Sequence, residues 1–276
     1  MDLFSNTAVV VLPVVYLAAA IGYGALFFSA NGRAGLVGSL CLRAGVLLHL
    51  GYLAALALRH GQFPAATVSQ ILTGIACAVA LVYLLLEWRS RERSTGLWIL
   101  GFVTLFQLLA SLTATAEVPA LAAFESALFG LHLALALLAY AAFTLAAGYG
   151  VLFLSLYREL KGARFQTFFN RLPPLEVLER MMNGALGGGL LCLTGAIAAG
   201  ALAARRLGVD DWLLDPWSLA TLAIWGLYAL AMVLQRVHRW QGRQTALACV
   251  AGIVVILVGL LAVHAGAPSF HGFHAS

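Results

Sequence analysis

The chain has 276 residues, of which 62% are hydrophobic and only 10% are charged, whereas a soluble globular domain carries roughly 25% charged residues. This composition excludes a water-soluble fold. Apolar runs of about 20 residues, the length that a helix needs to cross the hydrocarbon layer, recur along the chain. The strands of a transmembrane barrel would instead alternate apolar and polar residues. The sequence therefore predicts an all-α, polytopic integral membrane protein with a single membrane domain over residues 1–276.

Eight apolar runs predict eight transmembrane helices that are connected by short polar segments. The runs cover residues 8–28, 36–58, 68–86, 97–115, 126–157, 182–204, 216–235 and 245–265. No basic stretch precedes the first run, so we expect it to be the first span rather than a removable signal. An even number of spans places both chain termini on the same side of the membrane.

The distribution of arginine and lysine predicts the orientation of these spans. One alternating set of connecting segments holds 13 of the 16 basic residues, and the other set holds Arg59, Arg205 and Arg206. Short cytoplasmic loops are enriched in basic residues. We therefore expect both termini and the loop at 205–216 on the outer side. The net charge of +5 is then explained by contact with anionic lipid, without nucleic acid as a partner.

The segment 158–181 connects the fifth and sixth spans on the predicted cytoplasmic side. Leu175 and Leu178 recur there at helical spacing beside charged residues, which is typical of an amphipathic helix. Pro173 and Pro174 precede them, and proline is common in the first turn of a helix. We expect a short helix that lies in the membrane plane and acts as a connector or as a docking site for a partner.

Acidic and basic side chains are nearly absent from the centres of the predicted spans, and histidine is the exception. His49 lies in the second span, His132 in the fifth and His264 near the end of the eighth, while His274 lies in the C-terminal tail. An imidazole surrounded by lipid needs a hydrogen bond or a metal to offset its desolvation. Each histidine alone is expected to be a hydrogen-bonded interior residue. Together, His132 and His274 would supply the two axial nitrogens of a low-spin heme iron.

The predicted outer loop at 205–216 leads into the seventh span through the stretch GVDDWLLDPW. It contains the indoles Trp212 and Trp217, with Asp215 between them. Tryptophan at a membrane interface usually anchors a helix. Alternatively, the two indoles form a surface against which a flat porphyrin could stack. Composition leaves both interpretations open.

Longer stretches carry a family resemblance. FGLHLALALLAYAAFTLAAGYGVLFL contains a Leu-His pair followed by Tyr-Ala, and LPPLEVLERMMNGALGGGLLCLTGAIAAGALAA opens with an L-P-x-L-x-x-L pattern. DWLLDPWSLATLAIWGLYAL, RWQGRQTA and the tail HGFHAS follow. In these stretches the chain resembles the membrane cytochrome c assembly proteins, the CcsA/CcmC-type heme handlers. It is most similar to their small YpjD- and HemX-like branch.

The resemblance implies that heme, bound non-covalently as a b-type group, is the ligand. His132 and His274 match the two external heme-ligand histidines of the family, and Trp212 matches an indole of its Trp-rich loop. The implied role is heme handling in c-type cytochrome biogenesis at a bacterial inner membrane, where heme is held near the outer face. Cytochrome c assembly proteins or subunits of another membrane complex would be the partners.

Four further residues complete the candidate site. Trp217 and Asp215 belong to the same loop region, and His49 and His264 would be additional ligands or orienting groups. We expect no bond-making catalysis by this chain alone.

The chain also differs from the family pattern. Leu214 stands at the second Trp of the family loop, Ala220 at a later Trp, and Val233 near the family's histidine in the following helix. These differences favour an alternative function, in which the chain is a heme-free membrane scaffold or regulatory subunit that retains the fold.

Overall fold

The computed structural model describes residues 3–114, 118, 126–162, 171–206, 208, 211–237 and 242–266. Within these residues the secondary structure is helical, as the sequence predicts. The α-helices are α1 (Leu3–Ser29), α2 (Gly32–His60), α3 (Val68–Ser90), α4 (Gly96–Leu112), α6 (Ala127–Lys161), α8 (Leu175–Arg206), α9 (Pro216–Val237) and α10 (Gly242–Gly266). A short 3-10 turn, η1 (Trp212–Leu214), precedes α9.

Each of the eight predicted apolar runs corresponds to one of these helices. Six of them, α1, α2, α3, α6, α8 and α9, are long and apolar enough to cross a membrane, and α4 is a shorter apolar helix of 17 residues. The chain is therefore a multi-pass membrane protein. That all eight helices cross the bilayer, and that both termini face outward, stay predictions.

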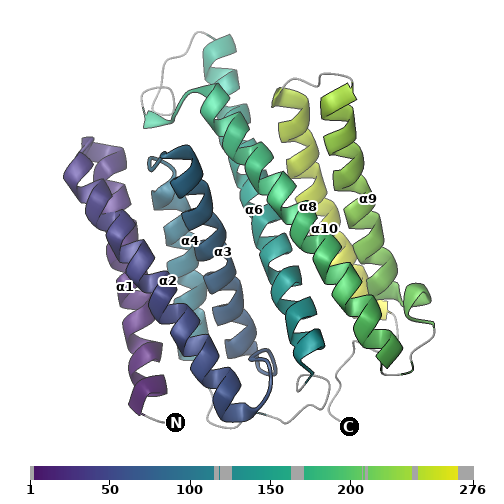
Figure 1. The fold of residues 1–276 in the computed structure, drawn as a ribbon. Coiled ribbons are helices and arrows are strands. Elements are labelled where there is room, and N and C mark those ends of the chain that lie inside the picture. Colours follow the sequence, from purple (N-terminus) through teal and green to yellow (C-terminus); the bar gives the residue numbers. More distant parts are fainter. Residues whose placement is uncertain are drawn as a thin grey trace.

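The helices run in alternating directions, so that α1 begins and α10 ends at the same end of the bundle (Figure 1). We call this end, at the bottom of Figure 1, the lower end, and the opposite one the upper end. The end of α2, the start of α6 and the turn η1 also lie at the lower end. The predicted outer loops thus gather at one end of the molecule.

The bundle consists of two packed groups of helices. In the N-terminal half, α1 packs against α2 and α4, and α3 packs against α4; in the C-terminal half, α6 packs against α8 and α10, and α9 packs against α10. Helix α3 joins the halves through its contacts with α6 and α8. Figure 1 shows the two groups side by side.

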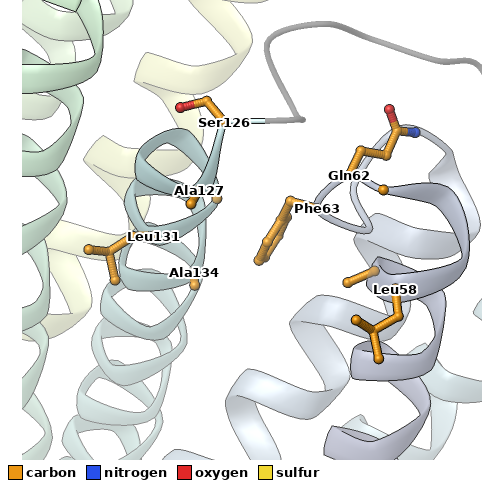
Figure 2. A pocket seen from close by; sticks show the side chains of 10 residues that line it. Leu58, Gln62, Phe63, Ser126, Ala127, Leu131 and Ala134 are labelled. Atoms are coloured by element: carbon orange, nitrogen blue, oxygen red, sulfur yellow. The ribbon is translucent and has the colours of Figure 1, made fainter.

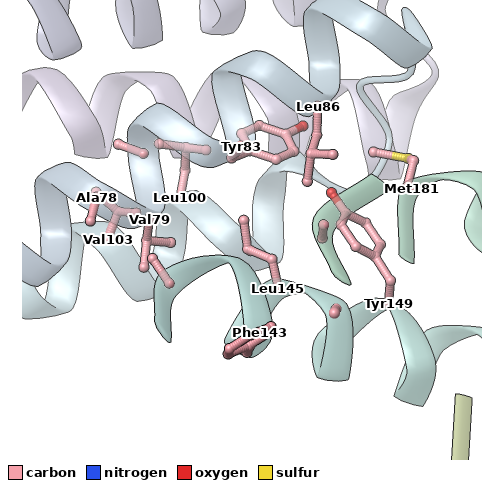
Figure 3. Close-up of a cluster of buried hydrophobic side chains, with 14 of the residues drawn as sticks. Ala78, Val79, Tyr83, Leu86, Leu100, Val103, Phe143, Leu145, Tyr149 and Met181 are labelled. Atoms are coloured by element: carbon pink, nitrogen blue, oxygen red, sulfur yellow. The ribbon is translucent and has the colours of Figure 1, made fainter. Parts of the chain in front are cut away.

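Small residues allow α6 and α8 to pack closely, as is common in membrane helix pairs. An added Cβ at Gly189 of α8 would lie 2.7 Å from the Phe143 ring of α6. Phe143 in turn stacks on Tyr228 of α9, with ring centroids 4.2 Å apart. Phe143 is among the buried apolar side chains shown in Figure 3. These contacts fix α6 against α8 and α9, which carry the candidate site.

The segment after the proline pair differs from the prediction. A helix does begin there, because α8 starts at Leu175 and Leu178 N–H donates to the Pro174 carbonyl at 3.2 Å. The prediction of a separate in-plane helix is wrong, because α8 continues without a break to Arg206. Leu178 and Met182 are fully buried in the bundle, so the apolar face of this segment packs on neighbouring helices. Residues 163–170 of the predicted connector lie outside the described part.

Candidate functional site

His132 lies in the second turn of α6 and is half-buried against α8. Its Nδ1 is 2.7 Å from the backbone carbonyl oxygen of Ala196. A carbonyl oxygen can only accept a hydrogen bond, so Nδ1 carries the proton and donates. The neutral ring then has its lone pair on Nε2. No described residue hydrogen-bonds to this nitrogen.

A glycine on α8 makes room for this imidazole. An added Cβ at Gly200 would lie 2.7 Å from His132 Nδ1 and 3.0 Å from Cε1. On α6, the Phe129 ring lies beside the imidazole, with ring centroids 5.8 Å apart. Ala196 and Gly200 are one turn apart on α8, so the carbonyl and the open space face the same side chain. The ring is therefore held in one orientation.

This arrangement suits a metal-binding histidine. Histidines that ligate a metal usually donate their other ring N–H to a carbonyl or carboxylate, which fixes the tautomer and the ring direction. The residues present at His132 therefore fit an axial ligand of heme iron.

The loop that leads into α9 is organised by Asp215. Its Oδ2 accepts hydrogen bonds from the backbone N–H of Trp217 at 3.0 Å and of Ser218 at 3.4 Å. Asp215 therefore caps the N-terminus of α9, and Pro216 occupies the first helical position. The carboxylate, predicted as a heme-binding group, has a structural partner in the helix it caps.

The two predicted indoles flank this cap. Trp212 lies in η1, and its carbonyl accepts from Asp215 N–H at 3.4 Å. Trp217 lies in the first turn of α9. Both side chains are half-buried, so part of each indole remains accessible. The cap thus holds the backbone of both tryptophans in one place.

Two of the predicted heme-binding groups lie at the same end of the bundle, and two others are not described by the structure. The start of α6, with His132, and the turn with Trp212 lie at the lower end of the bundle (Figure 1). His264 belongs to α10, two residues before its end at Gly266, and its side chain is outside the described part. His274 is also outside the described residues, so its pairing with His132 stays a prediction.

His49 lies in the N-terminal half, within a chain of buried polar side chains. Thr73 Oγ1 donates to Gln107 Oε1 at 2.8 Å, so the same hydroxyl accepts from His49 Nε2, 2.8 Å away. Tyr16 O–H then donates to His49 Nδ1 at 3.0 Å. The chain joins α1, α2, α3 and α4, and it uses both ring nitrogens. His49 is therefore a hydrogen-bonded interior residue, as expected for a single histidine in a span. The sequence did not indicate its partners.

An apolar hollow of about 570 Å³ lies between the end of α2 and the start of α6. Figure 2 shows Leu58 and Phe63 on one side and Ala127, Leu131 and Ala134 on the other. Gly130, which lines the hollow, precedes His132 by two positions. Because an α-helix turns by about 100° per residue, the two residues point about 200° apart around α6. The hollow therefore lies on a different face of α6 from the space that Ala196 and Gly200 leave for the imidazole, which we call the His132 slot.

Comparisons with known proteins agree on one family. The family described as Cytochrome C assembly protein matches residues 35–271. The chain is 26% identical to "Cytochrome c biogenesis protein CcsA" of Microcystis aeruginosa over 267 residues, covering 78% of this chain and 80% of the relative. It is 28% identical to the protein of the same description from Synechococcus sp. strain CC9605, covering 89% of this chain and 88% of the relative. No solved structure matches the chain significantly.

Proposed function

The chain belongs to the cytochrome c assembly protein family, and on that premise we propose that it binds heme near the outer face and passes it to a partner in c-type cytochrome biogenesis. The similar proteins from Microcystis and Synechococcus are described as cytochrome c biogenesis proteins. The observation that carries the proposal is His132, whose Nδ1–H is held by the Ala196 carbonyl while Nε2 keeps its lone pair.

In this proposal heme is the cargo, held without a covalent bond. His132 Nε2 provides one axial nitrogen and His274 the other. Trp212 and Trp217 offer their accessible indole faces to the porphyrin. Asp215 acts by capping α9, which keeps both tryptophans in position. His264 is a reserve ligand, while His49 holds the N-terminal half together. The chain itself makes and breaks no covalent bond.

The lower end of the bundle faces outward in this proposal. Seven basic residues lie at helix ends in the upper part of the bundle: Arg33, Arg89, Arg91, Arg158, Lys161, Arg236 and Arg243. At the lower end stand Arg59, Arg205 and Arg206. The excess at the upper end supports a cytoplasmic upper face, in a bacterial inner membrane. Partners would be other subunits of the assembly machinery.

A heme-free scaffold is the second candidate. Leu214 is largely exposed, at 71%, where the family has a tryptophan, and Asp215 has a structural role as a helix cap. Both observations would also hold in a relative that retains the fold without the ligand. The two candidates differ in whether function depends on the histidines.

The test is restoration of c-type cytochromes in cells from which this protein has been deleted. Covalently bound heme is stained after denaturing electrophoresis of membranes. The wild type and His60→Ala, a histidine at the lower end outside the proposed ligand set, are expected to restore the stain. The double variant His132→Ala/His274→Ala, present at equal level, is expected to leave it absent. Full restoration by the double variant would favour the scaffold.

A further inference from the structure

Glu87, near the upper end of α3, is a buried carboxylate with an exposed fraction of 3%. Its Oε1 accepts from Ser39 Oγ at 2.5 Å and pairs with Arg93 Nε at 3.3 Å. Tyr23 O–H donates to its Oε2. The carboxylate therefore ties α1, α2 and α3 to the turn before α4. Its negative charge is matched by the Arg93 guanidinium.

Buried hydroxyl groups without a hydrogen-bond partner gather beside this carboxylate. Tyr83 is one turn from Glu87 on α3, and Tyr149 comes from α6 in the other half. Neither phenol has a partner among the described residues, and the same holds for the hydroxyls of Ser94 and Thr95. Electrostatic interactions connect Tyr83 with Tyr149 and Glu87. Figure 3 shows the two phenol oxygens turned toward the same region beside Leu86.

Thr95 completes this group. It occupies the N-cap of α4, where a threonine side chain usually accepts a backbone N–H, but it makes no such bond. Its hydroxyl is fully buried. It lies within interaction range of both phenols, but no hydrogen bond of adequate distance and angle satisfies its hydroxyl among the described residues. Three buried hydroxyls thus lie close together, and none of them is satisfied by a well-formed hydrogen bond to a described residue.

A polar contact that falls short of a direct bond is often bridged by water. Buried water typically makes about three hydrogen bonds to otherwise unsatisfied groups. Because Arg93 already neutralises Glu87, a cation would bring an unmatched charge into the site. Hydroxyl groups both donate and accept hydrogen bonds, so they suit a small neutral molecule such as water.

We propose that Tyr83, Tyr149 and Thr95 enclose a site for ordered water at the upper end of the boundary between the two halves. The Arg93 side chain is 34% exposed, so the polar group around Glu87 extends to the surface of the bundle at this residue. The water joins α3 to α6 by hydrogen bonds, at the contact through which the two halves meet.

The direct test is X-ray hydroxyl-radical labelling of the full-length protein in detergent, with residue-level mass spectrometry. Radicals formed from bound water label the side chains beside it. Tyr228 is the matched control, because it is fully buried and its hydroxyl also lacks a partner among the described residues. We expect Tyr83 and Tyr149 to be labelled at least severalfold above Tyr228. Labelling of both at the Tyr228 level would overturn the proposal.

Phenylalanine variants give an independent readout. Tyr83→Phe and Tyr149→Phe remove groups that bind the water, so both are expected to lower the Tm of the purified protein. Tyr228→Phe removes a hydroxyl outside the group and is expected to leave the Tm unchanged or raise it. A rise in Tm for all three variants would indicate that the site is dry, because deleting an unsatisfied buried hydroxyl then stabilises the fold.

Discussion

Among the described side chains, each half of the bundle holds one interior histidine, and the two differ in whether a ring nitrogen is left without a hydrogen-bond partner. His49, in the N-terminal half, has both ring nitrogens occupied by Tyr16 and Thr73. His132, in the C-terminal half, has Nδ1 on a backbone carbonyl and no described partner at Nε2. An imidazole with both nitrogens bonded is a structural link. One with a single oriented bond retains the lone pair that a metal requires.

Crowding the space around the His132 ring should weaken heme binding and leave the stability of the fold unchanged. A Cβ at Gly200 would lie 2.7 Å from His132 Nδ1, so Gly200→Ala should displace the ring and lower heme affinity about tenfold or more. Heme titration of the purified variant would measure this. Gly188→Ala is the control on the same helix, because no atom lies within 4 Å of its Cβ position. Equal affinity of both variants would contradict the role of the slot.

Removing the other imidazole should affect the fold rather than heme. His49→Ala leaves Tyr16 and Thr73 without their partner inside the bundle and opens a cavity, which should cost about 2–4 kcal/mol of stability. A lower midpoint of thermal unfolding, with unchanged heme spectrum per folded molecule, is expected. Tyr16→Phe removes one bond of the same chain and should cost about 1 kcal/mol. Loss of the heme spectrum in folded His49→Ala would mean that His49 is a ligand after all.

The capping role of Asp215 can be separated from a charged role toward heme. Asp215→Ala should lower stability by about 1 kcal/mol, whereas Asp215→Asn should be close to the wild type because asparagine is an equally good cap. Chemical unfolding of both variants would measure the difference. Heme binding that is lost equally in the two variants would show that the negative charge matters.

The smallest effect is expected at the contact between α8 and α9. Trp225 Nε1 donates to Thr194 Oγ1 at 2.9 Å on the exposed surface of the bundle. Such interhelical bonds in membrane proteins contribute about 0.6 kcal/mol on average. Thr194→Val should therefore change stability by less than about 1 kcal/mol. A much larger loss would indicate that this bond positions α9 and its loop.

The helices were predictable because a span of about 20 apolar residues is a local signal. The continuation of residues 175–181 into α8 was not, because an amphipathic stripe looks the same whether it faces lipid headgroups or neighbouring helices. In contrast, the Asp215 cap has a readable signature, since Asp followed by Pro marks a helix start. That signal was present but was interpreted as a ligand group.

The site itself was predictable only in part. His132 stood out through its family motif, while its Ala196 partner lies 64 positions away on another helix. The chain around His49 draws Tyr16, Thr73 and Gln107 from three further helices. Pairings of this kind depend on how helices pack, and single-sequence periodicity carries no information about them.

Ligand replacement tests whether His132 Nε2 ligates heme iron. His132→Gly should remove an axial nitrogen, and added imidazole should bind in the vacated slot and restore it. The measurement is the absorption spectrum of the heme-loaded, detergent-purified variant as imidazole is titrated. We expect a low-spin spectrum in the wild type, its loss in His132→Gly and its return with imidazole. A wild-type low-spin spectrum that persists unchanged in His132→Gly without imidazole would contradict this ligation.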